Sequence, residues 1–242
     1  MTTHYKTRGF VFKKSDVNES DRNFSVFTED YGRLDIYAKA IRKSVSKLRS
    51  GMDSFFISDI EFIQGKKRKT LTDAQAVEKF CNLPQTPQKF RLANAMASLL
   101  DDFIKGQQKD RDIFNLINET FFELNNYALD SKPYTLIYYY FLWNFLSLLG
   151  YGPQVEKCAH CSVKLDPYNL YFSNKSGGVI CKKCLNHNEQ AVKINSDAVK
   201  LIRLILKKDW QIIFKLKIEP ACQNLFQEIS NNYCSYNSLK NN

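Results

Sequence analysis

Apolar and polar residues alternate along the first third of the chain, and this pattern predicts β-strands there. In one segment Leu34, Ile36 and Ala38 share a side, and in a later one Phe56 and Ile60 do. The candidate strands cover residues 5–14, 23–28, 34–40, 55–64 and 69–72. A period of two with short turns indicates a small antiparallel sheet, and five short strands fit an OB-type barrel.

The spacing of apolar residues becomes helical from about Asp73, where Ala76, Phe80 and Leu83 recur at helical intervals before two prolines. Longer apolar stripes predict helices over residues 90–106, 113–129 and 133–149, with Pro133 in a first turn, and two more helices from Ser196 and Pro220. We therefore predict an α+β multidomain protein. An N-terminal OB-fold β-barrel (residues 1–78) precedes an all-helical domain (residues 79–242) that carries a four-cysteine zinc finger, a ribbon insertion at about residues 155–190.

Four cysteines form two Cys-x-x-Cys pairs that are 19 residues apart: Cys158, Cys161, Cys181 and Cys184. This spacing is typical of a four-cysteine zinc site. A tight turn aims both sulfurs of a pair at one point, and a hairpin between the pairs brings the turns together, so that four thiolates surround Zn²⁺ at about 2.3 Å. Four protein ligands leave no position for water, so the predicted zinc is structural.

Other uses of these cysteines are weaker. A redox Cys-x-x-Cys normally opens a helix in a βαβ unit, which is not indicated here. His160 and His187 lie close enough in sequence to replace one sulfur, although four cysteines already complete the shell. Cys81, Cys222 and Cys234 fall in stretches expected to be helical, and we predict small buried side chains without a function.

The chain of 242 residues has a formal net charge of +10, which favours a polyanionic partner such as a nucleic acid. Two basic segments fall between candidate strands, where loops of an OB barrel flank the ligand face. They are residues 39–49, with no acidic residue, and 66–69. The predicted DNA-binding residues are Lys39, Arg42, Lys43, Lys47, Arg49, Lys66, Lys67, Arg68 and Lys69. Tyr37 is a candidate for stacking on bases. Two solvated charge runs remain the alternative.

Signatures of catalysis are not found: the chain has no GxxxxGK[ST], GxGxxG, HExxH or GxSxG motif and only three histidines. We predict no enzyme and no catalytic residue. The apolar run 137–149 is too short to cross a bilayer, and the first residues do not resemble an export signal. We therefore expect a cytoplasmic, nucleoid-associated protein without membrane contact, whose cysteines stay reduced.

Several of these stretches, in the same order, resemble the RecO family of bacterial recombination mediators. They are ESDR at 19–22, TEDYG at 28–32, AKAIR at 38–42, SKLR at 46–49, LLGYGP at 148–153 and GGVICKKC at 177–184. The family's basic loop corresponds to Lys39, Arg42 and Lys43. Ala40 stands where the family usually has glycine, and a positive φ would be unfavourable there.

The resemblance implies an N-terminal OB fold, a helical domain with a zinc finger and a non-enzymatic role in DNA repair and homologous recombination. Such a protein binds single- and double-stranded DNA, anneals complementary strands and, with RecR, helps load RecA onto DNA coated with single-strand-binding protein. The acidic C-terminal tail of that protein is an expected partner of the helical domain. A zinc-ribbon RNA-binding or ribosome-associated protein is the alternative, and a scaffold with incidental charge is the third.

Overall fold

The chain divides into two structural units. The computed structural model describes residues 3–127, 134–187 and 190–241. The first unit is Met1–Tyr127 and the second is Ala128–Asn242. The predicted division at residues 78/79 stays a prediction.

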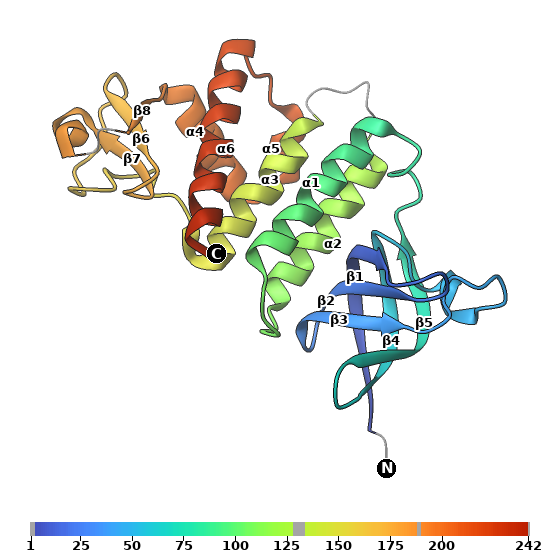
Figure 1. Cartoon of the computed structure of the whole chain (residues 1–242). Helices are drawn as coiled ribbons and strands as arrows, with labels where there is room; N and C mark the ends of the chain where they lie inside the picture. The colour runs from blue at the N-terminus through green and yellow to red at the C-terminus, as the bar shows by residue number, and fades with distance from the viewer. Residues whose placement is uncertain (1–2, 128–133, 188–189, 242) are drawn as a thin grey trace. The chain divides into compact units, whose positions relative to one another are not determined.

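Five strands of the first unit form a barrel (Figure 1). They are β1 (His4–Asp16), β2 (Arg22–Thr28), β3 (Gly32–Ala38), β4 (Phe56–Gln64) and β5 (Lys69–Lys79). Their order is β1-β2-β3-β5-β4, and β4 pairs with β1 to complete the ring. The link between β3 and β5 is parallel and short, with only Ile36 opposite Lys69 and Tyr37 opposite Thr70. The predicted OB-type barrel is confirmed.

The alternation in the sequence correctly locates the barrel core. Leu34, Ile36 and Ala38 are fully buried inside the barrel, together with residues of β1, β2, β4 and β5. Phe56, predicted to share a side with Ile60, is only half-buried. Phe56 is the first residue of β4, opposite Lys79 at the end of β5, and the Lys79 ammonium lies 5.3 Å from its ring centroid.

The predicted helix from Asp73 is wrong, because β5 continues to Lys79 beside β4. Two irregularities in the β4–β5 register, one of them near Asp73, remove the period of two that would have identified this strand. Cys81 follows in a turn and is exposed, so its predicted burial in a helix is also wrong.

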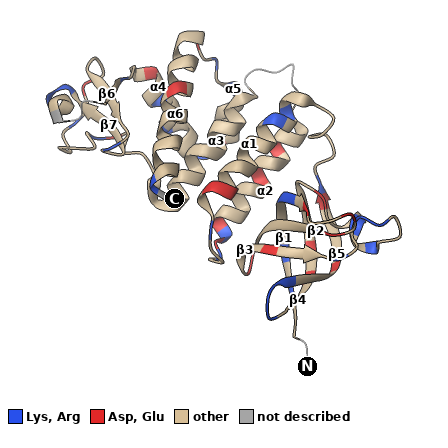
Figure 2. Cartoon of the chain, viewed as in Figure 1, with Lys and Arg blue, Asp and Glu red and all other residues tan. Residues whose placement is uncertain are grey.

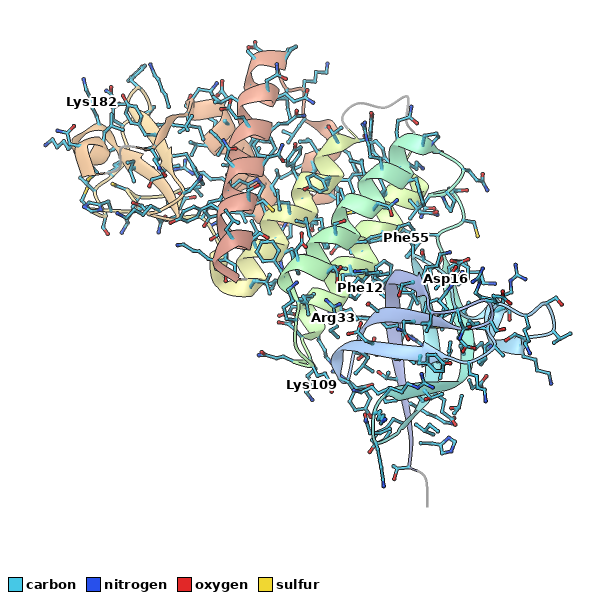
Figure 3. All side chains as sticks on the ribbon, in the orientation of Figure 1. Phe12, Asp16, Arg33, Phe55, Lys109 and Lys182 are labelled. Atoms are coloured by element: carbon cyan, nitrogen blue, oxygen red, sulfur yellow. The ribbon has the colours of Figure 1, made fainter. Side chains whose placement is uncertain are left out.

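Two helices complete the first unit: α1 (Pro87–Phe103) and α2 (Arg111–Asn126). Pro87 occupies the first turn of α1, and the Asp110 carboxylate caps α2 by accepting from two backbone N–H groups. Arg33, labelled in Figure 3, joins β3 to α1: it lies 2.8 Å from the Asp101 carboxylate and donates to the Ile104 carbonyl at 2.8 Å. The helices thus share one compact body with the barrel.

The second unit consists of helices around Trp143 and a cysteine-bearing ribbon. Its elements are α3 (Thr135–Leu146), β6 (Leu170–Ser173), β7 (Gly178–Cys181), β8 (Val192–Lys193), α4 (Ser196–Leu206), α5 (Trp210–Lys215) and α6 (Pro220–Asn241). The Trp143 indole donates to Ser230 Oγ at 3.0 Å and stacks on Tyr233, while Phe172 of the ribbon packs against both rings. The predicted helical region with a four-cysteine insertion is confirmed. Pro133 lies outside the described residues.

None of the helices within the described ranges combines the length and apolar character needed to cross a membrane.

Ala40 adopts the left-handed conformation, with φ of 53°, immediately after β3. This conformation costs a residue with a Cβ about 1–2 kcal/mol. The Ala40 N–H donates to Asp21 Oδ1 at 2.7 Å, so a hydrogen bond to a carboxylate holds the strained turn. Glycine would adopt this conformation without strain.

We expect Ala40→Gly to raise the free energy of unfolding by about 0.5–1 kcal/mol, because relief of strain exceeds the added chain entropy of glycine. The measurement is the urea midpoint at pH 7. Ala38→Gly is the matched control: this residue lies in β3 without a positive φ, so glycine should lower stability there. Equal effects of both changes would show that Ala40 is not strained.

Candidate metal centre and nucleic-acid interface

The four predicted cysteines converge on one point of the ribbon. All four Sγ atoms lie within 4.8 Å of one another. Cys181 Sγ is 3.8 Å from Cys161 Sγ and 3.7 Å from Cys184 Sγ. Sulfurs at 2.3 Å from a central Zn²⁺ would be separated by about 3.8 Å along the edge of a tetrahedron. The four cysteines are free thiols rather than disulfides, so the cluster fits a tetrahedral metal ion.

Backbone turns fix these sulfurs in place. The Ser162 N–H donates to the Cys158 carbonyl at 2.8 Å, and Ser162 has φ of 59°. The Cys181 N–H points at Cys158 Sγ at 3.4 Å and so connects the two pairs. In the turn between β6 and β7, Gly177 has φ of 69°, and a Cβ on Gly178 would lie 2.2 Å from the Gln154 carbonyl oxygen. Gly178 is therefore required sterically, whereas Gly177 is favoured by its positive φ.

The proton affinities of the thiols differ widely. Burial raises the pKa of Cys158, but N–H groups of residues 161, 181 and 160 outweigh it and lower this pKa to about 6. Burial of Cys184, together with the neighbouring thiols, raises its pKa to about 12. Without a cation, four adjacent thiols cannot all ionise. A bound divalent ion would supply the charge that makes four thiolates compatible.

The ligand set is that of a structural site. Cys158, Cys181 and Cys184 are buried and Cys161 is exposed. Sulfur ligands in a tetrahedron suit zinc or an iron–sulfur centre. His160 is exposed and is not needed to complete four ligands; the side chain of His187 lies outside the described residues. The site can order the ribbon, and zinc as its occupant remains a proposal.

The basic segment 39–49 leaves the barrel at Ala40 and returns through the short helical turn Lys47–Ser50. Ile41 is buried in the barrel core and Leu48 packs against it. The Arg42 guanidinium donates to the Asn18 carbonyl at 2.8 Å and lies 3.3 Å from the Asp16 carboxylate. Arg42 therefore supports the loop, rather than facing solvent without a partner.

The remaining basic residues of the two loops differ from those of the strands. On the strands, Lys6, Arg8 and Lys13 form ion pairs with carboxylates. Among the ion pairs of the described residues, none involves these loop cations: Lys39, Lys43, Lys47, Arg49, Lys66, Lys67 and Lys69. All are exposed except Lys69, which is half-buried. Figure 2 shows this basic charge on the loops of the barrel.

The proposed stacking role of Tyr37 is wrong. Its ring is only 8 % exposed, and the Arg68 guanidinium covers it at 3.5 Å from the centroid. Its hydroxyl donates to Asp21. Arg68 and Tyr37 thus join the second basic loop to the start of the first.

Sequence reasoning missed Tyr168, which is 88 % exposed in the ribbon, because burial cannot be inferred from a single aromatic in a turn.

Asp21 organises the start of the basic segment. Its carboxylate accepts from the Ala40 N–H, the Tyr37 hydroxyl and the Asn18 amide. These donors lower the pKa of Asp21 from 3.8 to about 2, with the Ala40 N–H contributing most. A shallow open pocket beside it is lined by Ser20, Lys39 and Lys43, among other residues.

Asp21→Asn should destabilise the protein near neutral pH, because it removes the charged acceptor. The carboxylate's contribution is present above pH 3.8 and is lost as pH falls through about 2, so the two proteins should converge in that window. Urea unfolding at pH 7, 5, 3 and 2 measures this convergence. Asp102→Asn, at an exposed position of α1, is the control. A gap that is constant with pH would contradict the role of Asp21.

Cys184→Ser should lower the metal content of the purified protein from one ion per chain towards zero and expose the ribbon to protease, since a ligand and much of the ribbon's folding free energy are lost. Metal analysis and limited proteolysis measure both effects. Cys81→Ser is the matched control, because Cys81 is exposed and outside the cluster. Full metal content in Cys184→Ser would rule out the four-sulfur site.

Comparison with known proteins covers almost the whole chain. Residues 1–80 match the family model "Recombination protein O N terminal", and residues 84–241 match "Recombination protein O C terminal". A protein named DNA repair protein RecO from Dehalococcoides mccartyi is 33% identical over 88% of this chain and 83% of its own length. The proteins of that name from Alkaliphilus metalliredigens and Acetivibrio thermocellus are 27% and 25% identical, over 94% and 98% of this chain and 91% and 93% of their own lengths. The chain belongs to the RecO family of DNA repair and recombination proteins.

Proposed function

We propose that this protein binds single- and double-stranded DNA through the two basic loops of its barrel and anneals complementary strands. The proposal is carried by the loop cations other than Arg42, which take part in no ion pair between described residues, on a barrel whose strand cations are largely paired. Exposed, unpaired Lys and Arg are the groups that neutralise phosphates and release counterions. Membership of a DNA repair and recombination family supports this choice of polyanion.

The mechanism is electrostatic. Two strands repel each other through their phosphates, and the loop cations lower this repulsion while they hold the strands close together. Lys43, Lys47 and Arg49 project from a loop that Arg42 and Ile41 fasten to the barrel, so the charges are held in one region. Lysines on a loop suit the phosphate backbone of any sequence, and the protein therefore has no need to read bases.

We further propose that the protein is a mediator without catalytic activity. The four cysteines fill a tetrahedron and leave no coordination position for a substrate. Zinc would hold the ribbon in shape when bound, and the chain's own side chains would bind the DNA. Cytoplasmic, nucleoid-associated action follows from this role.

The partners we propose are RecR, single-strand-binding protein and, indirectly, RecA. A groove of the second unit suits the acidic tail of single-strand-binding protein: Leu201, Leu204 and Ile218 supply apolar surface, and Lys200 and Lys217 lie at its side. Asp197, Glu219 and Cys222 also line it, and Asp197 pairs with Lys200 at 3.0 Å. Lys217 is thus the cation best placed to meet a carboxylate of the tail.

Changing Lys43, Lys47 and Arg49 together to Ala should weaken binding to a labelled oligothymidine and slow annealing. Loss of three phosphate contacts would flatten the log–log salt dependence of affinity by about 2, at about 0.7 per contact. Fluorescence anisotropy over a salt series gives the affinity and the slope, and fluorescence transfer between complementary strands gives the annealing rate, with and without RecR and bound single-strand-binding protein.

The matched control is a triple change of Lys6, Lys13 and Lys14 to Ala, which removes the same charge from the same unit at cations already paired with acids. Affinity should change less than in the loop variant. Equal loss in both variants would mean that net charge alone attracts DNA. An unchanged slope in the loop variant would reject the loop assignment, and preferential binding to RNA would favour the RNA-binding alternative.

A further inference from the structure

The cysteine ribbon carries a second set of unpaired cations. Six lysines of the ribbon are exposed, and no ion pair among the described residues involves them: Lys157, Lys164, Lys175, Lys182, Lys183 and Lys193. Figure 2 shows basic residues on this part of the chain, and Figure 3 labels Lys182 on the side of the ribbon away from α6. The ribbon thus repeats the charge pattern of the barrel loops.

The described acidic residues of the ribbon are occupied by other contacts. Glu156 lies 3.2 Å from the Arg203 guanidinium. Asp166 accepts from the Asn169 amide at 2.7 Å and from the Tyr168 N–H at 3.1 Å, and these donors, the amide first, lower its pKa. Neither of these two carboxylates forms an ion pair with one of the six lysines.

Two lysines are held opposite each other. Lys157 and Lys164 form an isolated antiparallel bridge that closes the turn around the first cysteine pair. Residues in such a pair have Cα atoms about 4.5–5.5 Å apart, and like charges directly opposite are destabilising. Lys182 and Lys183 lie between the cysteines of the second pair. The convergence of the four sulfurs brings the two basic turns together at one end of the ribbon.

The metal site itself explains part of this charge. Four thiolates around a divalent ion carry a formal charge of about −2, which nearby lysines would stabilise. With such an ion bound, two of the six lysines would offset that charge. The other four would remain available to an external anion.

Tyr168 adds a surface for bases. Its side chain is 88 % exposed, and Val163 in the first cysteine turn is 50 % exposed. The Asp166 carboxylate fixes the backbone of Tyr168, so an aromatic ring is presented to solvent from an ordered turn. Proteins bind single strands with exposed aromatic rings on which bases stack and with cations that meet the phosphates. The ribbon exposes both kinds of side chain.

We propose that the ribbon is a second binding site for single-stranded DNA, with Tyr168 as the stacking residue and Lys157, Lys164 and Lys182 as phosphate contacts. The proposal rests on the proposed annealing function, because annealing needs two strands on one protein. The barrel loops hold one strand and the ribbon holds the other. Each site lies in a different compact unit.

The test uses the full-length chain with the loop triple variant (Lys43, Lys47 and Arg49 to Ala) as background, so that residual binding of oligothymidine reports the ribbon. Tyr168→Ala should then weaken binding about 5-fold or more, and Tyr168→Phe should retain it, because stacking needs only the ring. Changing Lys157, Lys164 and Lys182 together to Ala should flatten the remaining salt slope by about 2. With intact barrel loops, both ribbon changes should slow annealing while binding of one strand persists.

Two measurements separate binding from folding. Metal content and protease resistance should stay unchanged in the ribbon variants, because the altered side chains are exposed and are not ligands. An oligonucleotide with bromodeoxyuridine should photocrosslink to the peptide that contains Tyr168, and mass spectrometry identifies that peptide.

The two proposals fail differently. In one outcome, the loop triple variant binds DNA more weakly, but the ribbon changes alter neither its residual affinity nor the annealing rate. In another, crosslinks map only to the barrel. Either outcome overturns the ribbon proposal and leaves the proposed function standing. If the loop triple binds normally and the ribbon changes abolish binding, the loop assignment fails and the ribbon site stands. If neither set affects binding, both are overturned.

Discussion

Among the described residues, cations on the barrel strands pair with carboxylates, whereas most cations of the two basic loops do not. Carboxylates of the barrel strands and of α1 neutralise the cations beside them: Asp59 pairs with Arg8, and Asp101 pairs with Lys13 and Arg33. The loop segments 39–49 and 66–69 contain no acidic residue. Their charges repel one another in the folded state, which lowers stability, and a polyanion relieves that repulsion. The same residues thus carry the electrostatic cost and the proposed affinity for DNA.

The first basic loop begins with a strained backbone at Ala40, which a hydrogen bond to the Asp21 carboxylate stabilises. Ala40 keeps a left-handed turn in which its N–H meets Asp21, and the Tyr37 hydroxyl meets the same carboxylate from β3. Arg68 lies over the Tyr37 ring and adds a link to the second loop. This arrangement fixes where the loop leaves the barrel, so its lysines start from a defined position although the side chains extend into solvent.

The barrel, the longer helices and the cysteine site could be predicted because each depends on local spacing, whereas the short helix α5 was not predicted. Leu34, Ile36 and Ala38 alternate, and two Cys-x-x-Cys pairs define their own turns. The length of β5 could not be predicted, since its pairing with β4 is interrupted by shifts in register. The alternation predicts that Tyr37 is exposed, yet Arg68, which is distant in sequence, covers its ring. The alternation predicts the side of the strand to which a side chain points. Whether another segment of the chain covers that side chain depends on the tertiary structure.

The cysteine site contributes to the charge of the surface as well as to the order of the ribbon. Lys157 and Lys164 face each other across one cysteine turn, and Lys182 and Lys183 occupy the other. Such like charges stay together only if the turns are fixed, and here the convergence of four sulfurs fixes them. Burial and the neighbouring thiols raise the pKa of Cys184 to about 12, so without a cation that thiol keeps its proton. The two cysteine turns are then not joined by a shared metal ion. A bound metal ion without chemistry of its own would therefore decide whether the ribbon presents one basic surface or two separate basic turns.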